Sequence, residues 1–428
     1  MKRRTMMKLS LAAGAAAVTG TGLAGCSGGG SDTLQVTLAN HPWSEAIRDM
    51  VPEFEAATGL TINLTQLGED QLSDQYNVKL NAGATDLDVL MYRPLQEGRQ
   101  FSQYGYLMDL TDRVNEGDYG WDDYQAGPQS ATMHEDQVLG VPLTTERECL
   151  YYRTDLLEQL GASEPPQTLD ELVELSARGA ADLGIAGFVA RTARSAAVTQ
   201  FSSYLYSHGA DFHSEDGRTS TLDAPEALAA YEMYGQLIRE YGPANVSTDM
   251  SWNEAMAIFT QGNALFYTEA DVLFPNATDP AKSQVSDTVG FAAFPAGPAG
   301  SRPFNIPSWA LAINEASQNQ DNAWEFVRWA TTKERTLQLQ SEQGLMSARS
   351  SAWNDASGTA GFPADLTESI NANSQDGVGH DRPLVIKVAQ AREIVGQPIV
   401  DAITGGDVAG SVQAAHEAFQ AFLDDEAE

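Results

Sequence analysis

The chain has 428 residues, 42% of them hydrophobic, and carries 59 acidic residues against 25 lysines and arginines. Its formal net charge of −34 argues against nucleic acids and anionic lipid surfaces as partners, because a field of that sign repels phosphate groups. A chain of this length and hydrophobic content is globular and too long for one core, so we expect two domains.

The first 25 residues have the pattern of an export signal. Four basic residues in MKRRTMMK precede the uncharged run LAAGAAAVTGTGLAG, which is too weakly apolar for a permanent membrane span. The Arg3-Arg4 pair resembles a twin-arginine signal, and LAGC resembles a lipobox that makes Cys26 the lipid-bearing residue. Residues 26–33 then predict a flexible tether. We expect a mature protein that is lipid-anchored at the extracellular face of a prokaryotic membrane; the alternative is an ordinary cleaved signal beside an incidental cysteine.

Removal of the signal leaves 21 basic residues against 59 acidic residues, a net charge of −38. The acids are scattered through every segment, and this resembles proteins of salt-loving organisms, in which dense counterions screen the repulsion. A merely acidic secreted protein is the alternative. Three Asn-x-Ser/Thr triplets are candidate glycosylation sites, at Asn63, Asn245 and Asn276.

Short apolar runs alternate with amphipathic helices, which predicts α/β architecture. Residues 34–40 predict a strand, followed by a helix that Ser44 caps and Gly59 ends. Ile47, Val51, Phe54 and Thr58 fall on one face of that helix. The next elements in the chain are expected to be a strand at 61–65, a helix at 71–84 and a strand at 87–92.

The middle of the chain repeats this alternation. Residues 138–143 and 148–153 each predict a short strand, and residues 154–161 predict a helix. Thr168 and Glu171 have capping-box spacing. The buried face of the helix that follows is expected to contain Leu169, Leu172, Val173, Ala177 and Ala180. Residues 252–267 predict a helix broken at Gly262 into a strand, and a later helix places Ala323, Phe326, Val327 and Ala330 on one side.

Several motifs occur in an order that resembles a known family. They are VLGVPLTTERECLYYRTDLLEQLGASEPPQTLDELVE, SWNEAMAIFTQGNALFY, VGFAAFPAGPAG and NIPSWALAINEASQNQDNAWEFVRWATTKE with QGLMSARSSAW. Together they resemble consecutive signatures of the family 1 extracellular solute-binding proteins of ABC importers, from about residue 34 to the C-terminus. The ending HDRPLVIKVAQAREIVGQPIVDAITGGD is similar to the members that carry sugars and sugar alcohols.

The resemblance implies an α/β fold of the two-lobed periplasmic-binding-protein type (type II) with a multi-segment hinge. One lobe would contain residues 34–142 and 310–344, and the other residues 143–306 and 346–428. The crossings would lie at 142–146, 305–309 and 345–349, where Pro, Gly or small polar residues allow torsional change. The resemblance also implies a monomer without cofactor, which binds a sugar or polyol between its lobes and delivers it to a membrane permease.

A neutral polyhydroxylated ligand presents apolar ring faces to aromatic rings and hydroxyls to planar polar groups. In open α/β sheets such ligands bind where strands end in loops, so we expect the site there. Trp43 is expected to lie in such a loop. Glu146 matches a position that in related maltose binders contributes a ligand carboxylate. The candidate ligand-binding residues are Asn40, His41, Trp43, Tyr92, Arg93, Glu146, Arg147, Arg191, Gln200, Glu269, Asp271, Trp309, Arg349, Asp381 and Arg382.

Three alternatives stay open at this stage. Several arginines fall at the expected cleft loops, so an acidic sugar or another anion is possible. The adjacent tyrosines Tyr151 and Tyr152 could ligate ferric iron, although alternation along a strand directs one of them into the core. A secreted carbohydrate-active enzyme is the third, but the chain lacks a recognisable acid/base motif, a nucleophile elbow and a histidine pair for zinc. We therefore expect neither catalysis nor a metal site.

Overall fold

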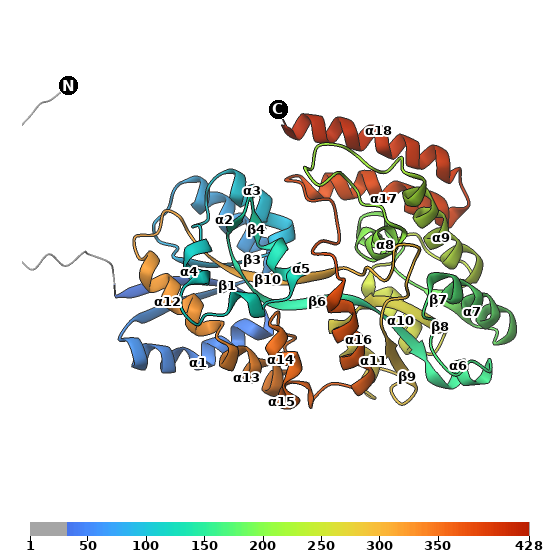
Figure 1. Ribbon diagram of the computed structural model, residues 1–428, viewed down its shortest axis with the longest axis horizontal. Coiled ribbons are helices and arrows are strands. Elements are labelled where there is room, and N and C mark those ends of the chain that lie inside the picture. Colours follow the sequence, from blue (N-terminus) through green and yellow to red (C-terminus); the bar gives the residue numbers. More distant parts are fainter. Residues whose placement is uncertain (1–31, 428) are drawn as a thin grey trace, which may run out of the picture.

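Figure 1 shows the computed structural model of the chain, which describes residues 32–427. The expected export signal, the lipidated Cys26 and most of the expected tether lie outside the described residues. Two bodies of α/β structure lie side by side and are joined by strands that run from one into the other. Within residues 32–427, no helix has both the length and the apolar character required to cross a membrane.

The first body, lobe 1, contains a sheet in the order β2-β1-β3-β10-β6. Its strands are β1 (Thr33–Ala39), β2 (Thr61–Leu67), β3 (Val89–Tyr92), β10 (Asn305–Ile313) and the first half of β6 (Val141–Arg153). β1 is parallel to β2 and β3, whereas β10 is antiparallel to both β3 and β6. Residue 33, assigned to the tether from the sequence, is the first residue of β1.

Helices cover both faces of this sheet (Figure 1). They are α1 (Pro42–Thr58), α2 (Glu69–Asn81), α3 (Arg99–Gln103), α4 (Thr111–Asn115), α5 (Ala126–Ala131), α12 (Gln320–Ala330) and α13 (Lys333–Gln343). Shorter elements are η1 (Pro94–Gly98), η2 (Trp121–Asp123) and the hairpin of β4 (Met133–His134) and β5 (Gln137–Val138).

The structure corrects the start of α1. The helix begins at Pro42, and the side chain of His41, not that of Ser44, caps it by accepting the N–H of Trp43. Proline at the first helical position has no N–H to leave unsatisfied, which favours this earlier start. The buried face contains Ile47, Val51 and Phe54 as expected, and Gly59 ends the helix with φ 77°.

Lobe 2 is built on the second half of β6, which pairs with β8 (Ala264–Ala270) and β9 (Val289–Ala292). β7 (Ala186–Val189) pairs with β8 in parallel. The helices of this lobe are α6 (Thr154–Gln159), α7 (Leu169–Asp182), α8 (Arg194–His208), α9 (Pro225–Tyr241), α10 (Trp252–Thr260), α11 (Phe274–Thr278), α16 (Ala364–Gln375), α17 (Val388–Thr404) and α18 (Val408–Ala427). η3 (Asp271–Leu273) follows β8, while α14 (Ser350–Asn354) and α15 (Ala356–Thr359) lie near the joint between the lobes (Figure 1).

Helix α7 confirms one expectation and corrects another. Thr168 and Glu171 form the capping box. The buried face turns through Leu175, Ser176 and Gly179, whereas Val173, Ala177 and Ala180 are only partly buried. Gly179 faces Leu265 of β8 so closely that a Cβ would lie 2.7 Å from the leucine side chain. Because Gly179 has no side chain, α7 can pack closely against the sheet along this face. The line of closest contact with the sheet, rather than the hydrophobic pattern alone, therefore determines which residues of α7 are buried.

β6 is one strand of 13 residues, not the two short strands expected at 138–143 and 148–153. Residues 141–147 pair with β10 in lobe 1, and residues 148–153 pair with β8 and β9 in lobe 2. The intervening polar residues looked like a break between strands, yet Thr144 and Thr145 are β-branched and favour extended structure. The Thr145 hydroxyl donates to the side-chain oxygen of Asn305, and the backbone N–H of Thr145 donates to the Met346 carbonyl. The three segments expected as crossings therefore lie together here.

Separate cores support the two lobes. One core is built from residues between Leu34 and Leu143 and between Trp309 and Ala348. Two further cores lie on either face of the lobe 2 sheet and are built from residues between Cys149 and Leu423, apart from those of lobe 1. The expected helix face of Ala323, Phe326, Val327 and Ala330 is buried in the first core.

Candidate functional site

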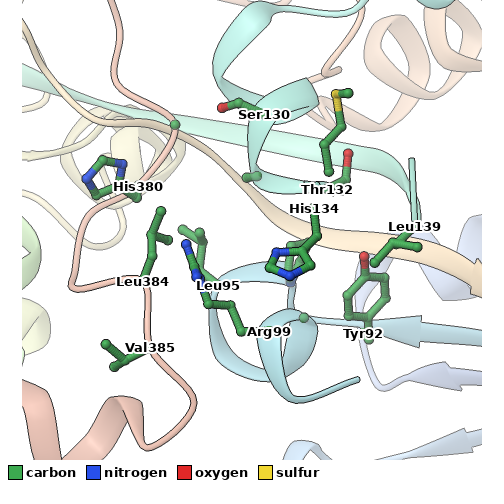
Figure 2. Close-up of a pocket in the computed structure, with 15 residues that line it drawn as sticks. Tyr92, Leu95, Arg99, Ser130, Thr132, His134, Leu139, His380, Leu384 and Val385 are labelled. Carbon is green, nitrogen blue, oxygen red and sulfur yellow. The ribbon is translucent and has the colours of Figure 1, made fainter. Parts of the chain in front are cut away.

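A cavity of about 260 Å³ lies between the two lobes, and we call it the inner cavity (Figure 2). Lobe 1 contributes Tyr92 at the end of β3, Leu95 of η1 and His134 of the β4–β5 hairpin. Lobe 2 contributes His380 and Leu384 from the segment between α16 and α17. Figure 2 shows Leu384 and Val385 on one side of the space and Tyr92, His134 and Leu139 on the other.

Several candidate residues of lobe 2 form a cluster centred on Glu269 at the end of β8. Arg191 donates two hydrogen bonds to this carboxylate, at 2.9 and 2.7 Å. The side-chain amide of Gln200 and the hydroxyl of Tyr267 also donate to it. Glu269 is fully buried and the Arg191 side chain is 13% exposed, so the two opposite charges are paired largely out of contact with solvent.

Asp381 and Arg382 form a second charged pair in the segment that borders the inner cavity. The guanidinium of Arg382 donates two hydrogen bonds of 2.5 Å to Asp381, and the Thr199 hydroxyl donates a third at 2.7 Å. Burial alone would raise the pKa of Asp381, but the charge of Arg382 outweighs it and holds the pKa well below its usual range. Asp381 is therefore ionised and Arg382 is neutralised by it.

Glu146 differs from these carboxylates. It lies in β6 opposite Ile306, and among residues 32–427 no hydrogen bond or ion pair engages its side chain. Burial and the negative charge of Asp381 raise the pKa of Glu146 from 4.5 to about 7, although Arg191 opposes the shift. Glu146 is not among the residues that line the inner cavity, and its role as a ligand-binding carboxylate stays a prediction.

Arg147 and Asp271 pair at the crossing of the lobes. Both side chains are fully buried, and the guanidinium lies 2.6 Å from the carboxylate. The backbone N–H of Arg147 donates to the same carboxylate at 3.1 Å, and the guanidinium lies 5.3 Å from the ring of Trp353. In this structure the pair is part of the packed joint between the lobes.

A third group of candidates lies in lobe 1. The rings of His41 and Trp309 are 6.2 Å apart, and the guanidinium of Arg93 lies 5.8 Å from the Trp309 ring. Arg93 is also paired with Glu97 at 2.6 Å and Glu69 at 2.8 Å. Burial lowers the pKa of His41 to about 4, so its imidazole is neutral near pH 7. The neighbouring Asn40 is exposed.

Two candidates lie in packed interiors rather than with these groups. Trp43 belongs to the first turn of α1, not to a loop as expected, and is 2% exposed in the lobe 1 core. Arg349 is fully buried; it donates to the carbonyls of Tyr119, Gly120 and Thr331 and lies 4.1 Å from a tyrosine ring, that of Tyr124. Their role as ligand-binding residues stays a prediction.

Sequence reasoning missed Arg99, Leu95, His134, His380 and Leu384, which line the inner cavity. None of them directly follows a predicted strand, the position at which ligand-binding residues are expected. Arg392 was missed as well. Its guanidinium donates to the Ser195 carbonyl and the Thr199 hydroxyl, and burial together with the charge of Arg382 lowers the pKa of Arg392 to about 9.

A family model described as bacterial extracellular solute-binding protein matches residues 40–336. The chain belongs to this family. Members of the family are extracellular or periplasmic binding proteins, which confirms the resemblance drawn from the motifs.

In the described residues, no group of three His, Cys, Asp or Glu side chains is placed to hold a metal ion. Tyr151 is fully buried and donates to the Ala270 carbonyl at 2.7 Å.

Individual relatives are similar over most of the chain. The erythritol/L-threitol-binding protein of Mycolicibacterium smegmatis is 24% identical over 378 residues, which are 78% of each chain. The mannitol-binding protein of Pseudomonas aeruginosa is 25% identical over 309 residues, 71% of this chain and 70% of that one. An ABC transporter solute-binding protein of Agrobacterium radiobacter in complex with ribitol has a TM-score of 0.73 at 23% identity, covering 91% and 98% of the two chains. This structural likeness confirms the two-lobed type II fold.

Proposed function

We propose that this chain is the substrate-binding component of an ABC importer for a sugar or sugar alcohol. It binds the ligand between its lobes outside the cell membrane and delivers it to the permease. The names of the two relatives, which specify erythritol or L-threitol and mannitol, support this ligand class. The protein acts by binding alone and leaves the ligand chemically unchanged.

The choice of a neutral ligand rests on the names of these two relatives, and the charge balance of two pairs in lobe 2 agrees with it. Arg191 is neutralised by Glu269, and Arg382 by Asp381, so these cations are not free to compensate an anion. Glu146, which has no partner among the described residues, would repel an acidic sugar when ionised. A hydroxyl, in contrast, donates to a carboxylate in a strong, charge-assisted hydrogen bond.

The mechanism rests on the two lobes. We propose that residues 34–142 with 310–344 and residues 143–306 with 346–428 move as units about the crossings at 142–146, 305–309 and 345–349. A ligand that contacts both lobes stabilises the closed arrangement by its differential affinity for that arrangement. Small-angle scattering is expected to show a smaller radius of gyration with saturating ligand, and an unchanged radius would contradict this mechanism.

The N-terminal motifs support a proposal for the location of the protein. We propose export through the twin-arginine route and lipid attachment to Cys26, with residues 27–32 as a spacer before β1 and the mature protein acting as a monomer. Cys26→Ser is expected to release folded protein from the membrane fraction into the medium. Retention of the variant in the membrane fraction would contradict lipid anchoring, and light scattering of the released protein tests the monomer.

A ligand panel tests the function. Titration calorimetry in high salt compares tetritols, pentitols, hexitols and disaccharides with sugar acids and ferric iron. We expect binding of at least one neutral compound and none of the acids or iron. Binding of a sugar acid alone would favour an anion importer, whereas a visible charge-transfer band with ferric iron would favour an iron carrier.

A further inference from the structure

The inner cavity adjoins a second hollow of about 650 Å³, which we call the outer groove. Both are lined by Arg99, His134, Leu384 and Val385, so these four residues form the junction between them. The junction contains residues of both lobes: Arg99 and His134 come from lobe 1, and Leu384 and Val385 from the segment that precedes α17. The free space between the lobes thus has two compartments in series.

The two compartments differ in chemistry. The inner cavity is bordered by Tyr92, Leu95, Leu139 and Leu384, with apolar surfaces suited to one face of a sugar or a carbon chain. The outer groove is bordered mainly by polar side chains of both lobes, which include Gln103, Gln137, Asp216, Arg218 and Asp424. Within residues 32–427, the side chains of Gln103, Gln137 and Arg218 make no hydrogen bond or salt bridge, so their donors are available to a ligand.

Arg99 occupies the junction, and Figure 2 shows it between the segment that carries Leu384 and the hairpin that carries His134. Its side chain is partly buried, and within the described chain no hydrogen bond or salt bridge engages it. Burial lowers the pKa of Arg99, while the charge of Glu426 opposes the shift. A guanidinium has five N–H donors, and a desolvated one without a partner is costly, so a ligand oxygen at the junction would be favourable.

The volumes indicate how large the ligand is. Pockets of roughly 300 to 1,000 Å³ enclose drug-sized ligands, and the inner cavity of about 260 Å³ is below that range. It suits a single small unit. The outer groove, at about 650 Å³, has room for a second unit of that size.

We propose that the ligand consists of at least two linked polyhydroxylated units, such as a disaccharide or a glycosyl polyol, with Arg99 bound to it at the junction. One unit occupies the inner cavity and the next lies in the outer groove. This inference rests on the proposed function, because it specifies the size of the sugar or polyol that the same site takes.

The test uses matched pairs of ligands in calorimetry: glucose with maltose, and sorbitol with maltitol. In at least one pair the two-unit member is expected to bind about tenfold or more tightly than the one-unit member. Arg218→Ala and Gln137→Ala are expected to weaken binding of the two-unit ligand about three- to tenfold and to leave the one-unit ligand unchanged. Arg328→Ala is the matched control, since it removes an exposed arginine on α12 that pairs with Asp118.

Two other outcomes overturn the proposal. If the one-unit ligands bind as tightly as their two-unit partners and the groove variants change neither, the outer groove is only the opening of the cleft. If no member of either pair binds, the inference fails together with its premise of a neutral sugar or polyol. Arg99→Gln adds an independent readout: it should weaken ligands of both sizes while Arg218→Ala affects the larger ones alone.

Discussion

Gly379 of lobe 2 lies directly against Gly127 of lobe 1. A Cβ on Gly379 would come within 2.7 Å of the Gly127 carbonyl oxygen and 2.2 Å of the Ser130 hydroxyl. Gly127 itself packs on the carbonyl of Asn305, at the start of the crossing strand β10. The glycine pair therefore sets how closely the lobes approach one another beside the joint.

Gly379→Ala is expected to hold the lobes apart, because the methyl group meets backbone that cannot move freely. We expect ligand affinity to fall about tenfold or more, and the radius of gyration of the ligand-saturated protein to remain near that of the empty one. Scattering and calorimetry measure the two effects. Gly361→Ala is the control, since a Cβ there meets nothing within 4 Å. Equal closure of both variants would contradict this role of Gly379.

Asp271→Asn is expected to destabilise the protein by about 3 to 5 kcal/mol, because it leaves the fully buried charge of Arg147 without its counterion. Denaturant unfolding measures the loss. Asp321→Asn is the matched control in an exposed pair with Arg113, where the loss is expected to be below about 1 kcal/mol. Similar losses in the two variants would show that the buried pair has no special role.

Trp43→Ala tests whether this tryptophan packs the core or stacks on ligand. Its position in the lobe 1 core predicts a loss of about 3 to 5 kcal/mol in the free energy of unfolding of the empty protein. Trp252, which is 40% exposed on α10, provides the comparison, and Trp252→Ala is expected to change stability by less than about 1 kcal/mol. An unchanged melting temperature together with weaker ligand binding would instead support the stacking role.

Glu146 predicts a pH dependence of stability. Its folded pKa of about 7 exceeds the usual 4.5, so between these values the folded state retains a proton that the unfolded state has lost. The contribution of this group to stability is therefore present at low pH and is lost as the pH rises from about 4.5 to about 7. Thermal unfolding of Glu146→Gln is expected to lack that component, whereas Glu325→Gln on the exposed face of α12 retains it.

The same residue predicts how binding changes with pH. Because an ionised carboxylate accepts hydroxyl hydrogen bonds more strongly, the affinity for a neutral ligand is expected to rise as the pH passes through about 7. Calorimetry at pH 6 and pH 8 is expected to show this rise in the native protein and not in Glu146→Gln. A pH-independent affinity in the native protein would mean that Glu146 does not contact the ligand.

Local patterns predicted much of the fold, because they depend on residues close in sequence. The face of α1, the capping box of α7 and the change from α10 to β8 at Gly262 follow from spacing, caps and glycine conformation. The single strand β6 did not follow, since its polar middle is stabilised by hydrogen bonds to distant segments, such as that of Thr145 to Asn305.

Of the candidate ligand-binding residues, Tyr92 is the one that lines the inner cavity. The rule that ligands bind at strand ends also selected Glu146, Arg191, Glu269 and Asp381; their charges lie close together in the structure, but these residues do not line the inner cavity and their role in binding stays a prediction. Arg99 was missed, because it reaches the cleft only through the path of η1 after β3. The spacing of residues in the sequence does not indicate in which direction η1 carries the chain after β3.

The continuous run of β6 through both sheets has a consequence for how the molecule is put together. Each lobe needs its half of β6 to complete its strand pairing. A chain cut at the centre of β6 would therefore expose unpaired backbone in both fragments. The halves are thus interdependent in assembly, although their interiors are separate. A chimera that exchanges one lobe between two relatives would therefore have to keep β6 intact.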